Sequence, residues 1–105
     1  MKIVNLTPHE ITLVKGSSKE ILPSEGLARC SVITEQLGDV NGYPINKNRF
    51  GEVTGLPDPQ PETMYVVSQI VAQALKGLRD DLLIVDKTVR DDAGRICGCT
   101  AFAVV

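Results

Sequence analysis

The stretch MYVVSQIVAQALKG, residues 64–77, joins a strand-like apolar run directly to a helix-like run, and Ser68 lies at the joint. Three roles fit a serine there: a nucleophile, part of an anion-binding helix start, or a helix cap. A nucleophile elbow needs glycines around the serine, whereas Ser68 lies between Val67 and Gln69. We therefore favour the cap, whose hydroxyl oxygen accepts hydrogen bonds from first-turn N–H groups. Capping combined with anion binding at the same helix start is the alternative.

The only histidine, His9, ends the polar motif NLTPH. Asn5, Thr7 and His9 occupy alternate positions, so they would project from one side of a strand that continued through Pro8. They could then contact a polar ligand. We favour a polar turn in which Asn5 or Thr7 satisfies nearby backbone groups. Because one serine and one histidine without an orienting acid make no hydrolytic set, we predict no catalytic residue.

Two arginines stand beside paired aspartates, Arg79 in RDD and Arg90 in VRDD. Paired carboxylates can act in acid–base catalysis or hold a divalent ion. Neighbouring residues in a turn rarely aim at one point, however, so we interpret both motifs as turn formers. If either arginine has a binding role, its rigid fork suits recognition of an anion better than catalysis.

The three cysteines give a weak metal signal. Cys97 and Cys99 are two residues apart, and a zinc site would need Cys30 and His9 to converge on them. One Cys-x-Cys motif without a second paired motif does not indicate such a site. We predict small thiols in a reducing compartment, with no metal and no cofactor.

Composition limits the class of protein and of partner. A chain of 105 residues with 43% hydrophobic residues has room for one modest core, so we expect a single globular domain over 1–105. No apolar run approaches the roughly 18 residues of a membrane span, and residues 1–13 do not resemble a secretory signal. A net charge of −2 offers no basic face for phosphates. We therefore expect a cytoplasmic protein that binds neither nucleic acid nor membrane.

Three turn signals predict three hairpins. The first lies within 9–22, where GSS separates two apolar runs. The second follows from Asn41-Gly42, because both residues tolerate positive φ, and pairs 29–40 with 43–49. The third is centred on DDAG and pairs KTVR with RICGCTAFAVV. The apolar run 82–85 before it predicts a separate short buried strand.

The remaining segments predict one stiff connection and one helix. Three prolines within GLPDPQPE favour an extended, rigid path. The helix covers 68–77, with one apolar stripe made of Ile70, Val71, Ala74 and Leu75. Its segment is also long enough to cross between two parallel strands. The predicted class is α+β, a mostly antiparallel β-sheet with hairpins and one short helix packed on the sheet.

Five segments taken together resemble a known family: NLTPHEI, LPSEGLAR, FGEVTGLPDPQPETMYVVSQIVAQAL, RDDLLIVD and VRDDAGRICG. In this order they are similar to a family of small uncharacterised proteins of bacteriophages and actinomycetes, over nearly the whole chain. The family brings no established activity. Small phage proteins of this size include sponges, which sequester the nucleotide signals of bacterial immune systems, and this analogy implies an anti-defence role.

The residues and the resemblance together favour binding without catalysis. We expect a homo-oligomer, most simply a homodimer, that binds a small anionic ligand such as a cyclic nucleotide or an ADP-ribose derivative. The alternative is a structural or protein-interaction module of a virion or an accessory protein, without a small ligand. The expected ligand contacts are Arg79, Arg90, Ser68, Tyr65, Asn5, Thr7 and His9.

Overall fold

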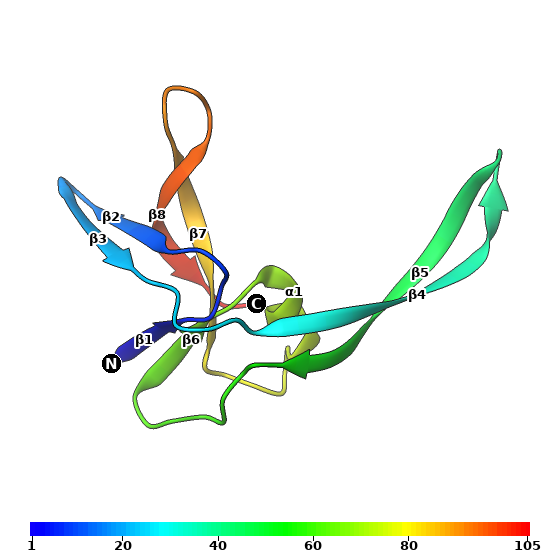
Figure 1. The fold of residues 1–105 in the computed structure, drawn as a ribbon, viewed down its shortest axis with the longest axis horizontal. Helices are drawn as coiled ribbons and strands as arrows, with labels where there is room; N and C mark the ends of the chain where they lie inside the picture. The colour runs from blue at the N-terminus through cyan, green and yellow to red at the C-terminus, as the bar shows by residue number, and fades with distance from the viewer.

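The computed structural model describes residues 1–105 and contains eight strands and one short helix (Figure 1). The elements are β1 (Lys2–Asn5), β2 (Ile11–Lys15), β3 (Ser18–Leu22), β4 (Arg29–Val40), β5 (Tyr43–Thr54), β6 (Thr63–Val66), α1 (Gln69–Ala74), β7 (Leu82–Arg90) and β8 (Ile96–Ala103). All three predicted hairpins form. The helix has six residues, and no helix in the chain is long and apolar enough to cross a membrane.

Six strands form one sheet in the order β1-β6-β7-β8-β2-β3, and β4 pairs only with β5. The α+β class with antiparallel hairpins is confirmed, but the sheet is mixed rather than mostly antiparallel. β1 runs parallel to β6, β6 runs parallel to β7, and β2 runs parallel to β8. The parallel β6–β7 pair follows from the connection through α1, because a crossover returns the chain in the same direction.

Ser68 caps α1, as the sequence predicts. Its side chain accepts a hydrogen bond from the Val71 N–H, with 3.3 Å between nitrogen and oxygen. The helix is shorter than the predicted range 68–77, and its buried face is also different. Val71 and Ala72 are buried, whereas Ile70 is 47% exposed. The predicted stripe is therefore wrong at Ile70, which borders an open depression beside the start of β4.

The hydrophobic core is small and lies where β6, α1, β7 and the start of β4 meet. Only 11 of 105 residues are buried, so most of the chain contributes little to the core. The cluster consists of Leu6, Ala28, Tyr65, Val67, Val71, Ala72 and Leu82.

The β4–β5 hairpin, Arg29–Thr54, extends away from all other strands, and we call it the arm (Figure 1). The molecule measures 51 × 39 × 20 Å, and its radius of gyration is 16.6 Å, against about 13 Å for a compact domain of this length. Its accessible surface is 7506 Å², whereas a compact monomer of this mass exposes about 5,700 Å². The isolated chain thus exposes about 1,800 Å² more than a compact monomer.

Candidate interaction site

The arm is a long two-stranded ribbon whose shape comes from backbone pairing and one turn. Its strands pair from Arg29 opposite Thr54 to Val40 opposite Tyr43. The turn residues Asn41 and Gly42 both have positive φ, 53° and 83°, as the type I′ turn of a two-residue hairpin requires. The predicted pairing is confirmed, and β5 continues five residues beyond the predicted end at 49, to Thr54. No residue of either strand is buried.

The end of the arm carries four exposed apolar side chains. Tyr43 and Ile45 share one face because they are two residues apart on β5, and Val40 lies directly opposite Tyr43. A register shift between Gln36 and Gly38 places Leu37 beside the same group. We call these four residues the tip cluster, and they are exposed as follows: Leu37 61%, Val40 57%, Tyr43 74% and Ile45 43%.

The middle of the arm is polar and well paired, whereas the part nearer the core is again apolar. Thr34 Oγ1 and Asn48 Oδ1 lie 2.8 Å apart in a cross-strand hydrogen bond, and such pairs fix the register of a ribbon. Val32 lies opposite Phe50, and these two side chains are 46% and 47% exposed. Contiguous exposed apolar groups of this kind mark protein interaction surfaces, and both outer edges of the ribbon can also add a strand.

The arm is firmly attached where it joins the core. Cys30 and Val53 lie opposite each other and pack against the core cluster. Gly55 directly follows β5 with φ of 80°, and any Cβ at this position would overlap the carbonyl oxygen of Leu27. This close approach fixes the direction in which the arm leaves the core.

The predicted ligand contact Asn5 is a structural residue in this fold. It is 0% exposed, and its side-chain nitrogen donates to the carbonyl oxygens of His9 at 2.9 Å and of Leu22 at 3.1 Å. Its side-chain oxygen accepts from the N–H of Thr7 at 2.9 Å and lies 2.6 Å from the Thr7 hydroxyl. The NLTPH motif is therefore the polar turn that the sequence favours, and it joins the end of β1 to the end of β3.

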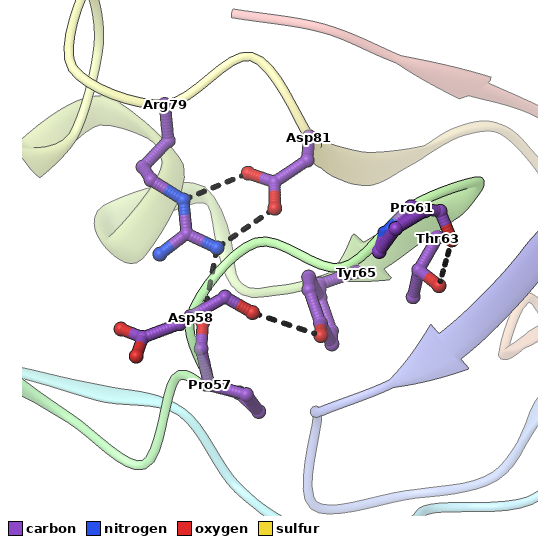
Figure 2. Close-up of polar contacts among 7 residues, drawn as sticks. All are labelled: Pro57, Asp58, Pro61, Thr63, Tyr65, Arg79 and Asp81. Atoms are coloured by element: carbon purple, nitrogen blue, oxygen red, sulfur yellow. Dashed lines mark hydrogen bonds and ion pairs between the residues drawn. The ribbon is translucent and has the colours of Figure 1, made fainter.

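Arg79 is engaged within the chain (Figure 2). Its Nε and Nη2 donate to the two carboxylate oxygens of Asp81 at 2.9 Å and 2.7 Å, and Nη2 also donates to the Pro57 carbonyl at 3.0 Å. These bonds lower the pKa of Asp81 below its usual value. They also connect the proline-rich segment to the start of β7, so the guanidinium has a structural role in the isolated chain.

Tyr65, the predicted stacking residue, lies under the same connection. Its side chain is 3% exposed, and its hydroxyl lies 3.4 Å from the Asp58 carbonyl oxygen (Figure 2). A ring covered to this extent offers no free face to a base. The proline-rich segment has no regular secondary structure, and the contacts of Arg79 and Tyr65 keep it against the core.

The predicted ligand contacts do not gather in one place in a single chain. Arg90 donates to the Gly94 carbonyl at 2.7 Å, and β7, which separates it from Arg79, spans roughly 25 Å at the usual rise per strand residue. Ser68 instead borders a depression together with Pro8 and Arg29. No local pattern indicates that Arg29 is a neighbour of Ser68, because the two residues come from distant segments.

The cysteines occupy different environments. Cys99 is 2% exposed, and burial raises the pKa of its thiol. Cys97 is exposed and Cys30 is partly buried. A register shift at Val89 and Arg90, opposite this part of β8, interrupts the alternation that would place Cys97 and Cys99 on the same face.

No protein-family model, no curated protein and no solved structure matches this chain. The resemblance to small phage proteins therefore stays a prediction, and the functional conclusion depends on the geometry of the arm and of its surroundings.

Proposed function

We propose that this protein is a structural or protein-interaction module that works within a larger assembly, to which it is joined by the arm. The observation that carries the proposal is the tip cluster, four apolar side chains held at the end of a hairpin that has no buried residue. Tyr43 within this cluster is of a residue type that often anchors protein interfaces.

Two further properties support a partner for the arm. About 1,800 Å² of excess surface is of the size that stable interfaces remove from water. The arm also has a defined direction, because Gly55 lies against Leu27 and the Cys30–Val53 pair packs on the core. A pre-organised binding element loses less entropy on association than a flexible one does.

A photoreactive phenylalanine analogue at position 43 tests the proposal in cells that produce the protein. We expect cross-linking to a protein partner at this position and none from the same group at Leu78, which is 76% exposed in the loop after α1 and serves as the matched control. In a second protein the analogue replaces Ile45 instead. Adding Tyr43→Asp to that protein should remove its cross-link. Equal labelling at positions 43 and 78 would contradict a role of the arm.

A small anionic ligand, such as a cyclic nucleotide or an ADP-ribose derivative, is the second candidate, and the depression bordered by Ser68, Pro8 and Arg29 supports it. Arg29 is exposed, so its guanidinium is accessible to an anion. Calorimetry against a panel of these nucleotides tests this candidate. We expect Arg29→Ala to abolish binding and Arg90→Ala to leave it unchanged, and a flat response across the panel would exclude the candidate.

A further inference from the structure

A second exposed surface lies on the opposite side of the molecule from the arm. A depression of ≈ 560 Å³ lies between the β2–β3 hairpin and β8, and we call it the β8 groove. Its lining is half apolar, including Val14 and Phe102, and it also contains Lys15, Lys19 and Glu20. In Figure 1 the arm points away from β2, β3 and β8, so the tip cluster cannot reach the groove of its own chain.

From these two surfaces we infer that the partner of the arm is a second copy of this chain, with the tip cluster of one copy seated in the β8 groove of the next. This inference rests on the proposed function and names its partner. One chain carries both an apolar projection and a depression whose lining is half apolar, so identical copies can associate head to tail. Such a contact closes into a ring or continues as a filament.

Charge complementarity agrees with this pairing. The only charged residue between 36 and 46 is Asp39, which lies at the end of the arm on the face opposite Val40 and Tyr43. The β8 groove is lined by Lys15 and Lys19 against a single Glu20, so the charge of Asp39 would be attracted to the groove once the end of the arm is inserted in it. Opposite charges at the edge of an apolar contact favour the correct orientation and faster association.

The area of surface agrees as well. A standard interface covers about 800 Å² on each partner, and a chain in a head-to-tail assembly makes two such contacts, about 1,600 Å² in all. The whole chain exposes about 1,800 Å² more than a compact monomer, which is enough surface for two such contacts. A single contact with an unrelated protein would leave one of the two apolar surfaces open.

Light scattering and sedimentation of two variants, alone and mixed, test the inference. Tyr43→Asp removes the main side chain of the tip, and Thr100→Arg fills the groove at an exposed position of β8. We expect wild-type protein to form larger species as its concentration rises, and each variant alone to be monomeric, with association weakened roughly 30-fold or more. An equimolar mixture should give a 1:1 heterodimer, because one variant keeps an intact groove and the other an intact tip.

The outcomes separate this inference from the proposed function. Loss of assembly in Tyr43→Asp but not in Thr100→Arg would overturn the groove as the docking surface and leave the arm as the binding element. A wild-type chain that stays monomeric at its highest soluble concentration would overturn the second copy as partner, and the cross-linked protein at position 43 would then identify another. Leu78→Asp is the control and should assemble like the wild type, and circular dichroism confirms that each variant is folded.

Discussion

The core and the arm use apolar residues in opposite ways. β6 has only four residues, yet Tyr65 and Val66 within it are buried. The two strands of the arm have 12 residues each, and none of them is buried. In the core, apolar side chains decide the fold because they leave water on folding. In the arm, backbone pairing and a glycine turn decide the shape, and the apolar side chains remain free for an interface.

The same substitution in both regions gives the sharpest contrast. Leu6→Ala should lower the free energy of unfolding by roughly 2–5 kcal/mol, because Leu6 is 4% exposed and its removal leaves a cavity. Leu37→Ala should change it by less than about 0.5 kcal/mol in dilute protein, because Leu37 already contacts water. Urea denaturation measures both values. Equal losses would mean that the end of the arm is packed within its own chain.

The junction between the two regions is the next most sensitive place. Gly42→Ala, in the turn at the far end of the arm, serves as the comparison. It should cost about 1 kcal/mol, because the alanine is forced to positive φ but meets no neighbouring atom. Gly55→Ala has the same φ penalty and must also displace the Leu27 carbonyl, so we expect a loss of roughly 3 kcal/mol. Thermal unfolding compares the two variants. Similar costs would show that the close approach at Gly55 does not hold the arm.

The smallest expected effect concerns acid and lies in the core region alone. Arg79 lowers the pKa of Asp81, so the pair stabilises the fold above the unfolded carboxyl pKa of about 3.9, and this contribution disappears as the pH falls through the lower folded value. Asp81→Asn should therefore remove part of the loss of stability below about pH 4. Urea denaturation at several pH values measures it, with Asp92→Asn as control, since Asp92 is exposed in the turn between β7 and β8.

Local signals in the sequence predicted much of this fold. Asn41-Gly42 predicted the arm, and Ser68 predicted the start of the helix, because each acts through its nearest neighbours in the chain. The pairing of β1 with β6 joins residues 2–5 to residues 63–66, and no local pattern encodes a contact over that separation. The exposure of the arm could not be predicted from the sequence either, because the same apolar residues also occur in strands that another layer covers.

The candidate ligand residues show the same limit. The carboxylate neighbours of Arg79 indicated a turn, and the structure finds Arg79 bonded to Asp81 at that turn. Its bond to the Pro57 carbonyl depends on a segment 22 positions away, for which the sequence had no signal. The sequence also does not predict the tip cluster as a site, because the pattern around Tyr43 and Ile45 indicates only a strand.

The turn at Asn41 and Gly42 has a consequence for the order in which the protein is made. Hairpins with such turns form in roughly 1–10 μs, and residues 29–54 leave the ribosome before residues 63–66, on which β1 depends for its pairing. The arm therefore begins to pair while the core is still unformed, and packing of Cys30 and Val53 on the core stabilises it later. In the head-to-tail assembly proposed above, chains made side by side on one messenger RNA would meet through this element first.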